Sequence, residues 1–337
     1  MLHLLACWSY GIELHAIVLE TPGDRLVIRD EERPVPEPAS GDALVRVEAA
    51  GFCHHDALIM AGVLLRGVRL PLVLGHEFAG VVEAVGPDTP PELVGMHVTA
   101  LPGAFGHRAD GAFAEYVVVP VSSLVTLPDG VAPDVGALLA CPAGVALKAV
   151  KDIGIVAVGE TVVVSGVSGG LGSSVAQIAH ALGARVIGVT TSADKLTGLE
   201  AHAWLDAVVV DEGSVPLAEV VRALTDDAGA DVFIDTVGAN AGATVASLAR
   251  GGRLVLLGHT GEDAGDFPVA EILFREAHIM GSLGVERQHV EHAIALLSAG
   301  HLVPQVDREL PLSASSVEQA YGLLRTRAVT GRIVLTV

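Results

Sequence analysis

The chain has 337 residues, enough for two domains, and 51% of them are hydrophobic, which is typical of a folded globular protein and excludes a disordered one. Its 40 acidic and 20 basic side chains give a formal net charge of −20. Because an acidic surface repels phosphate, this charge disfavours a nucleic-acid partner and otherwise indicates solubility.

The three cysteines, Cys7, Cys53 and Cys141, lie too far apart along the chain to indicate a disulfide framework. We therefore expect a reducing, cytoplasmic location. The apolar start of the chain, residues 1–14, has no basic region and no clear cleavage site. It is a weak anchor or a misassigned start, and the second interpretation is favoured because HAIVLETPGD, which follows, is typical of a first strand and turn.

The first part of the chain, residues 15 to about 130, is predicted to be rich in β-strands. ALVRVEAAG alternates apolar and polar residues, and EFAGVVEAVG, MHVTALP and AEYVVVP follow it between glycines and prolines. This pattern predicts an antiparallel, barrel-like domain.

Residues that could bind a metal occur at three places in this part and just after it. GFCHHD contains Cys53, GHE contains His76 and Glu77, and ACPAG contains Cys141. Thiolate and imidazole are zinc ligands, and three protein ligands with one open position form a catalytic site. Cys53, His76 and Cys141 are therefore predicted to hold zinc, with Glu77 as a fourth or exchanging ligand. Taken singly, each has a structural interpretation, and Cys141 in its apolar surroundings could be a small core residue.

From about residue 143, strands alternate with helices, which predicts a parallel, doubly wound sheet. TVVVSG runs into a glycine-rich turn, and the helical SSVAQIAHALG follows. In such a turn, glycines and the amides of a helix start can bind a pyrophosphate, although a purely structural turn is the alternative. The residues that we expect to bind the nucleotide there are Ser168, Gly169, Gly170, Leu171 and Gly172.

The end of the next strand, GVTTSADK, indicates which nucleotide is bound. NAD sites place a carboxylate there, whereas this chain has Thr190. Thr191, Ser192 and Lys195 offer hydroxyls and a cation for a 2′-phosphate, so we predict NADP(H) rather than NAD(H). The alternative is that Ser192 caps a helix and Lys195 is solvated.

Two further features concern the topology. Residues 161–184 carry no Asp, Glu, Lys or Arg, but SGVSGGLGSS interrupts them, so a strand, a loop and a buried helix are favoured over a membrane span. After Gly284, the chain has a helical VEHAIALLSAG and a final strand, GRIVLTV, which has no neighbouring strand of its own in the sequence. That last strand is predicted to return to the first domain.

The order of GFCHHD, GHEFAG, ALLACPAG, SGVSGGLG and FIDTVG resembles the medium-chain dehydrogenase/reductase superfamily, and within it the zinc-dependent alcohol dehydrogenases. The resemblance covers nearly all of residues 15–337. It implies an α/β fold with a GroES-like β-barrel catalytic domain (1–142 and 284–337) and a Rossmann nucleotide-binding domain (143–283). It also implies a small-molecule substrate, a homodimer or homotetramer, and no membrane partner.

The resemblance assigns further residues. Asp56 matches the carboxylate that orients the histidine ligand of the zinc, and His54 and Arg332 match positions that face the cofactor pyrophosphate. Two features depart from the family. GMHVTALPGAFGHRADGAFAEY lacks the four cysteines of a structural zinc lobe, so we expect one catalytic zinc and no structural zinc. His55 replaces the usual Ser or Thr that passes on the alcohol proton.

An imidazole at His55 can carry a proton near neutral pH, but the residue could equally be part of the pocket wall. The first functional hypothesis is therefore a zinc alcohol dehydrogenase or carbonyl reductase. The second is an NADPH-dependent reductase of an activated C=C bond, similar to quinone and acryloyl-CoA reductases. The third is a non-catalytic NADPH-binding protein, against which the zinc ligands argue.

Overall fold

The computed structural model describes residues 13–259 and 267–337. They divide into two compact units. Unit 1 contains the described residues up to Ala140, Val306–Ala328 and Arg332–Val337, and unit 2 contains the described residues between Cys141 and Gln305 together with Val329–Gly331. The start of the chain, which we interpreted as misassigned, lies outside the described residues up to position 12.

Unit 1 is built mainly from β-strands, as its alternating sequence predicted. One sheet has the order β2-β1-β4, and a seven-stranded sheet has the order β15-β16-β3-β5-β6-β8, with β7 paired to β3. The elements are β1 (Glu13–Thr21), β2 (Val27–Pro34), β3 (Asp42–Phe52), α1 (His54–Met60), β4 (Leu72–Val73), β5 (Phe78–Val85), β6 (His97–Ala100), β7 (Tyr116–Pro120), β8 (Leu124–Thr126), α2 (Pro133–Ala137), β15 (Val306–Pro311), α10 (Ala314–Arg325) and β16 (Arg332–Thr336).

The last strand returns to unit 1, which confirms the prediction for GRIVLTV. Strand β16 pairs antiparallel with β3, so that Ile333 lies opposite Phe52 and Thr336 opposite Ala49. Phe52, Ile333 and Val334 are all buried. This pairing brings the C-terminal strand next to the end of β3, where the first predicted zinc ligand follows.

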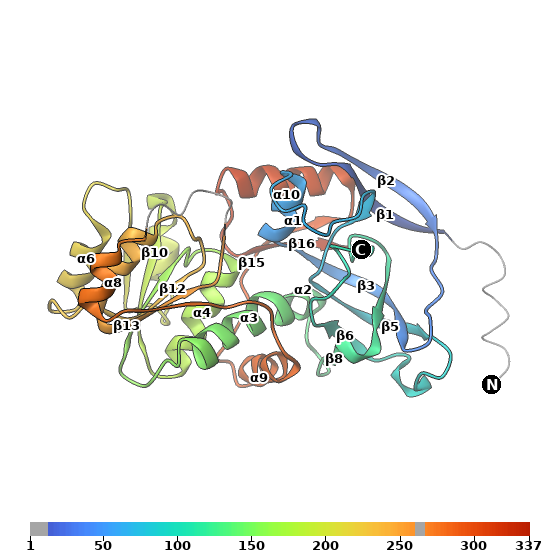
Figure 1. Cartoon of the computed structure of the whole chain (residues 1–337). Coiled ribbons are helices and arrows are strands. Elements are labelled where there is room, and N and C mark those ends of the chain that lie inside the picture. The colour runs from blue at the N-terminus through green and yellow to red at the C-terminus, as the bar shows by residue number, and fades with distance from the viewer. Residues whose placement is uncertain (1–12, 260–266) are drawn as a thin grey trace. The chain divides into compact units, whose positions relative to one another are not determined.

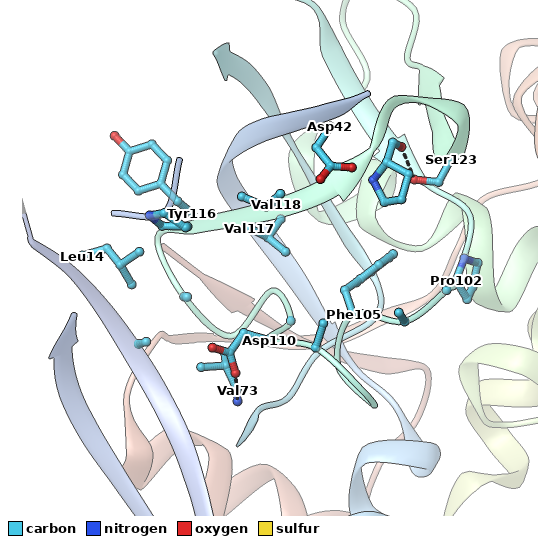
Figure 2. A pocket seen from close by; sticks show the side chains of 18 of the residues that line it. Leu14, Asp42, Val73, Pro102, Phe105, Asp110, Tyr116, Val117, Val118 and Ser123 are labelled. Carbon is cyan, nitrogen blue, oxygen red and sulfur yellow. Dashed lines mark hydrogen bonds between the residues drawn. The ribbon is translucent and has the colours of Figure 1, made fainter. Parts of the chain in front are cut away.

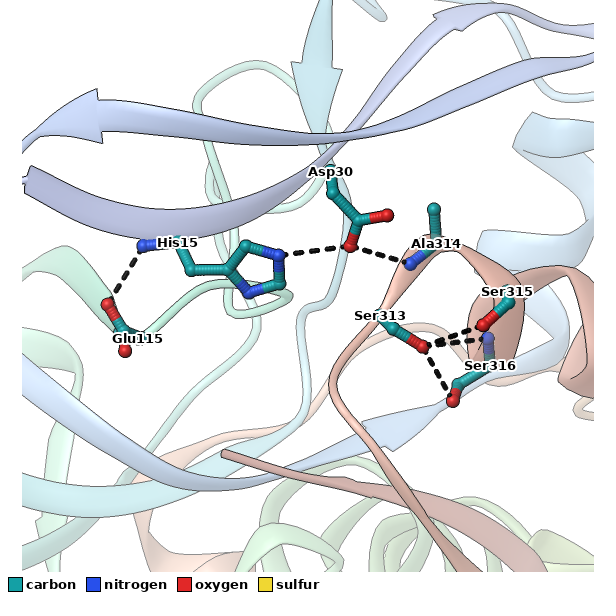
Figure 3. Close-up of polar contacts among 7 residues, drawn as sticks. All are labelled: His15, Asp30, Glu115, Ser313, Ala314, Ser315 and Ser316. Atoms are coloured by element: carbon teal, nitrogen blue, oxygen red, sulfur yellow. Dashed lines mark hydrogen bonds and ion pairs between the residues drawn. The ribbon is translucent and has the colours of Figure 1, made fainter.

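The C-terminal helix of unit 1 is attached to the first hairpin through Asp30 (Figure 3). Oδ1 of this carboxylate lies 3.0 Å from Nε2 of His15 on β1 and accepts a hydrogen bond of 3.1 Å from the backbone N–H of Ala314. Ala314 is the first residue of α10, and the side chain of the preceding Ser313 accepts a hydrogen bond from the N–H of Ser316. The start of α10 is therefore capped within the chain and also linked to β2.

Unit 2 is a parallel six-stranded sheet with the order β11-β10-β9-β12-β13-β14 and with helices along its connections (Figure 1). Its elements are α3 (Val145–Leu147), β9 (Thr161–Ser165), α4 (Gly170–Ala181), β10 (Arg185–Thr190), α5 (Leu196–Glu200), β11 (Ala207–Val210), α6 (Leu217–Leu224), β12 (Ala230–Asp235), α7 (Ala241–Ala246), β13 (Leu248–Leu256), α8 (Val269–Arg275), β14 (His278–Gly281) and α9 (Arg287–Ser298). The expected α/β fold class, a GroES-like barrel with a Rossmann sheet, is confirmed.

The boundary between the units differs from the expected one at residue 284. Residues 284–305 belong to unit 2, because α9 packs there: Val290 and Ala293 are fully buried, and Nε2 of His289 lies 2.7 Å from Oδ2 of Asp152. The chain also passes from unit 1 to unit 2 slightly earlier than expected, between Ala140 and Cys141. The contacts of α9 with its neighbours could not be inferred from its own periodicity.

The uncharged segment 161–184 forms β9, the glycine-rich turn and α4, as predicted. No helix within the described part of the chain is long and apolar enough to cross a membrane.

Candidate metal centre and nucleotide loop

Cys53 lies where strand β3 gives way to helix α1. It occupies the N-cap position with extended backbone angles, and its side chain accepts from the backbone of the third helical residue, Asp56. In return, Oδ2 of Asp56 accepts a hydrogen bond of 3.0 Å from the N–H of Cys53. This reciprocal capping holds the thiol and the carboxylate on the first turn of the helix.

His76 is positioned by the glycine before it and by Asp56. Gly75 has a φ of +94°, and a Cβ atom there would lie 2.5 Å from the ring of Phe113, so the turn requires glycine. Nδ1 of His76 lies 3.2 Å from Oδ1 of Asp56, which also accepts from the N–H of Gly75. Because Nδ1 faces Asp56, Nε2 is the nitrogen available to a metal.

Glu77 is fully buried beside this histidine. Its Oε1 lies 3.7 Å from Nε2 of His76 and 3.2 Å from Nη2 of Arg332, which is also buried. A Cβ atom on Gly51 would come within 2.3 Å of Oε2 of Glu77, so the glycine leaves space for the carboxylate. The chain therefore accommodates a buried negative charge at the place where a cation was predicted.

Cys141 completes the group. It directly follows Ala140 and lies in a π-helical segment, Leu139–Gly144, that contains Pro142. Ligand atoms of Cys53, His76, Glu77 and Cys141 all lie within 4.8 Å of one another. Ligands of a tetrahedral zinc ion are about 3.3 to 3.8 Å apart, so two sulfurs, one nitrogen and one carboxylate at this spacing fit zinc.

The charges around His76 also suit a cation. Burial of the ring lowers the pKa of His76, but the negative charges of Asp56 and Cys53 outweigh this effect and raise the pKa well above its usual value. The site therefore favours a positive charge on or beside the imidazole, and a bound metal would take the place of that proton.

His55, the next residue but one after Cys53, contacts His76 edge to face, with ring centroids 4.8 Å apart. Burial is the main reason that the pKa of His55 is lowered, and the nearby His76 adds to this effect. The ring is therefore held neutral, in the form that can accept a proton. His54, at the start of α1, is half buried, and its predicted contact with the pyrophosphate stays a prediction.

The glycine-rich turn lies between β9 and α4, as predicted. Gly166 has a φ of +62°, and a Cβ atom on Gly172 would lie 2.2 Å from the carbonyl oxygen of Gly166, so both positions require glycine. Gly169 is the N-cap of α4 and has no side chain to accept from the helix amides. The turn is fixed by Gly331, which donates to the carbonyl of Ser168 and accepts from the N–H of Gly170.

The residues predicted to select the nucleotide lie beside this turn. Nζ of Lys195 lies 3.4 Å from Oγ of Ser168 and donates to the carbonyl of Val329. Lys195 is thus not a solvated surface residue. Ser192 precedes a short 3₁₀ helix but makes no side-chain capping bond, so the alternative roles considered for these two residues do not apply.

Asp235 was not identified from the sequence. It is buried at the end of β12, where Oδ1 accepts from Oγ of Ser165 and from the N–H groups of Val237 and Gly238. Thr236 donates to the carbonyl of Ser165. The carboxylate therefore fixes the ends of two neighbouring strands next to the glycine-rich turn. Its signal is an Asp at the carboxyl end of a parallel strand, the edge at which such sheets bind ligands.

A cavity of about 620 Å³ in unit 1 contains none of the predicted site residues (Figure 2). Leu14, Phe105 and Tyr116 contribute to its wall, and Asp110 accepts from the N–H of Val73 at one side. The chemistry of the donor atoms, and not the size of a cavity, therefore identifies the candidate site.

Two family models match the chain. Residues 39–129 match the alcohol dehydrogenase GroES-like domain, and residues 170–299 match the zinc-binding dehydrogenase domain. The first match contains the positions of Cys53, His76 and Glu77, and the second contains part of the glycine-rich turn.

Curated relatives and solved structures are similar over almost the whole chain. An acryloyl-coenzyme A reductase of Sulfurisphaera tokodaii is 30% identical over 346 residues, covering 96% of this chain and 99% of the relative. An NAD-dependent alcohol dehydrogenase of the same organism is also 30% identical, over 90% of this chain and 95% of the relative. The crystal structure of AibC superposes with a TM-score of 0.87 at 33% identity and covers 97% of this chain and 96% of AibC.

Proposed function

Since this chain belongs to the medium-chain dehydrogenase/reductase superfamily, in its zinc-dependent alcohol dehydrogenase-like branch, we propose that it interconverts an alcohol and an aldehyde or ketone with NADP(H). The observation that carries the proposal is the convergence of Cys53, His76, Glu77 and Cys141 within 4.8 Å. A reductase that needed only nucleotide and substrate would not require two thiols and an imidazole at one point.

Zinc and the nicotinamide, when bound, supply Lewis acidity and hydride transfer. The protein's own part is to hold and orient them. Cys53, His76 and Cys141 provide the donor atoms, and Glu77 provides a carboxylate that can exchange between a ligand position and Arg332. Asp56 fixes the ring of His76 through Nδ1, so that Nε2 faces the donor set.

His55 is proposed to accept the proton that leaves the alcohol, and to return it in the reverse direction. Its ring lies next to that of His76, and its lowered pKa keeps a lone pair on one nitrogen. Replacement by Gln keeps polarity but removes this base. His55→Gln is expected to lower kcat for alcohol oxidation by about 10²- to 10⁴-fold, the usual range for a general base, with bound zinc unchanged.

NADP(H) is proposed as the nucleotide for two reasons. Thr190 occupies the strand end at which NAD sites carry a carboxylate, and Lys195 lies beside the glycine-rich turn, where its Nζ contacts Oγ of Ser168. A carboxylate at that position would repel a 2′-phosphate, whereas a cation attracts it. Ser192 and Thr191 add hydroxyl groups on the same segment.

Reduction of an activated C=C bond is the second candidate, and the similarity to an acryloyl-coenzyme A reductase favours it. The two functions are expected to differ in their dependence on the metal. In the first, zinc would polarise the oxygen of the carbonyl group that takes up the hydride, whereas the second adds hydride to a C=C bond that its own carbonyl group already activates. The test is to assay the zinc-loaded and the chelated protein with aldehydes, ketones and the matching alcohols, and separately with enones and acryloyl-CoA. Carbonyl reduction that disappears on chelation supports the first function. Activity on enoyl substrates alone, unaffected by chelation, would contradict it.

A further inference from the structure

A row of three imidazoles extends from the candidate metal centre. The ring of His55 lies 4.8 Å from that of His76 and 5.4 Å from that of His107, measured between centroids. Each ring comes from a different segment: His76 follows Gly75, His55 lies on α1, and His107 lies in the loop between β6 and β7. Among the ring contacts of the described residues, His107 touches His55 and not His76.

The proton on His107 can be assigned from its surroundings. Nε2 lies 3.0 Å from the carbonyl oxygen of Arg66. A carbonyl can only accept a hydrogen bond, so Nε2 must carry the hydrogen, and Nδ1 of the neutral ring has a lone pair. That Nδ1 is buried and has no hydrogen-bond partner among the residues that the structure describes.

Nδ1 of His55 is in the same condition, since it is buried and makes no hydrogen bond within the described chain. Buried polar atoms normally have partners, so two unsatisfied imidazole nitrogens on neighbouring rings indicate that a polar group binds at these rings. A metal ion does not account for Nδ1 of His107, because neither candidate metal-binding group in the described residues contains this residue, although one of the groups contains His55.

The chemistry of that group follows from the two nitrogens. With its hydrogen on Nε2 alone, His107 offers a lone pair on Nδ1 and needs a donor, and neither a carboxylate nor a carbonyl oxygen fits that tautomer. His55 can carry its hydrogen on Nδ1 and then needs an acceptor. A hydroxyl group is both donor and acceptor, so one hydroxyl satisfies both nitrogens.

We propose that the substrate carries a hydroxyl group besides the oxygen that reacts, and that Nδ1 of His107 and Nδ1 of His55 bind it. The oxygen that reacts would bind next to His76 and the other donor atoms. His107 is farther from these atoms, because the ring of His55 contacts both histidines and, within the described part of the chain, the ring of His107 does not contact that of His76. This inference rests on the proposed function and narrows its substrates to hydroxy-aldehydes, hydroxy-ketones and diols.

The experiment compares pairs of ligands that differ only in this hydroxyl, such as propane-1,2-diol with propan-1-ol and hydroxyacetone with acetone. Binding to the zinc-loaded enzyme with NADP⁺ or NADPH is measured by calorimetry, and turnover is measured in parallel. The hydroxylated member of each pair is expected to bind at least about tenfold more tightly, because an unfilled polar site rejects the analogue that lacks the hydroxyl.

Three variants locate the preference. His107→Gln can still donate to Arg66 but has no acceptor in place of Nδ1, and is expected to lose the preference. His107→Asn can place Oδ1 where Nδ1 was and is expected to keep part of it. His97→Phe, at an exposed histidine of the same unit, is the control and should bind both ligands as the wild type does. Thermal melts establish that each variant is folded.

Equal binding of both members by the wild type, as expected if only water fills the position, would overturn the inference. So would a preference that survives in His107→Gln. If the proposed function is wrong, the enzyme turns over no alcohol or carbonyl compound. The binding measurement still tests this inference in that case, because it does not require turnover.

Discussion

Glu77 and Arg332 form a buried ion pair beside the predicted zinc ligands, with Oε1 and Nη2 3.2 Å apart. The pair joins the residue after His76 to the first residue of β16, and β16 is paired with the strand that ends just before Cys53. The C-terminal strand therefore contributes a charge to the candidate site as well as a strand to the sheet. Through Arg332, this strand also holds the carboxylate of Glu77, which could serve as an exchanging ligand.

Glu77→Gln is expected to destabilise the metal-free protein by about 3 kcal/mol, since it removes the negative charge that lies 3.2 Å from the buried guanidinium of Arg332. Urea unfolding in the presence of a chelator measures the change. Glu83→Gln is the control, because Glu83 pairs with Arg46 at the surface, where both side chains are about two-fifths exposed. The control should change stability by less than about 1 kcal/mol. Equal effects in the two variants would contradict a structural role for the buried pair.

Asp56→Asn is expected to weaken zinc binding by about 10- to 100-fold, because the amide cannot accept from Cys53, Gly75 and His76 as the carboxylate does. Competition with a chromophoric chelator measures the affinity. Asp110→Asn is a matched control: Asp110 also accepts from a backbone N–H, that of Val73, but belongs to neither candidate metal-binding group of the described residues. Unchanged affinity in Asp56→Asn would show that Asp56 does not orient the histidine.

Much of this fold could be inferred from the sequence, because the relevant signals are local. TVVVSG and the glycines after it specify a strand, a turn and a helix, and each residue acts on its immediate neighbours. The zinc ligands could also be proposed, since thiols are scarce in this chain and the residue types themselves imply the chemistry.

What the sequence could not reveal depends on contacts between distant segments. The ion pair of Glu77 with Arg332, the buried Asp235 and the position of His107 beside His55 each join residues that are far apart in the chain. The placement of α9 in unit 2 has the same origin, because its buried face meets a partner only in the folded chain. The periodicity of one segment shows that it has a buried face but not which element covers that face.

Ser313→Ala is expected to lower the free energy of unfolding by about 1 kcal/mol, the usual effect of losing a side-chain N-cap. The hydroxyl of Ser313 accepts from the N–H of Ser316, and no other group in the described first turn of α10 is shown to replace it. Ser315→Ala, at an exposed position two residues later, removes a hydroxyl without removing the cap and should stay within about 0.5 kcal/mol of wild type. Urea denaturation of both variants decides whether the cap contributes.

Lys195→Ala is expected to raise the dissociation constant for NADPH by about 10- to 100-fold while leaving that for NADH nearly unchanged, because only NADPH carries the 2′-phosphate. Fluorescence titration of both nucleotides measures the two constants. The comparison is needed because Nζ also bonds to Ser168 and Val329, so a general loosening of the turn would weaken both nucleotides together. Lys151→Ala, at a lysine that contacts His292 on α9, controls for the loss of a positive charge elsewhere in unit 2. If Lys195→Ala weakens NADH as much as NADPH, the lysine supports the turn and does not select the nucleotide, and the preference for NADP(H) would have to come from another residue.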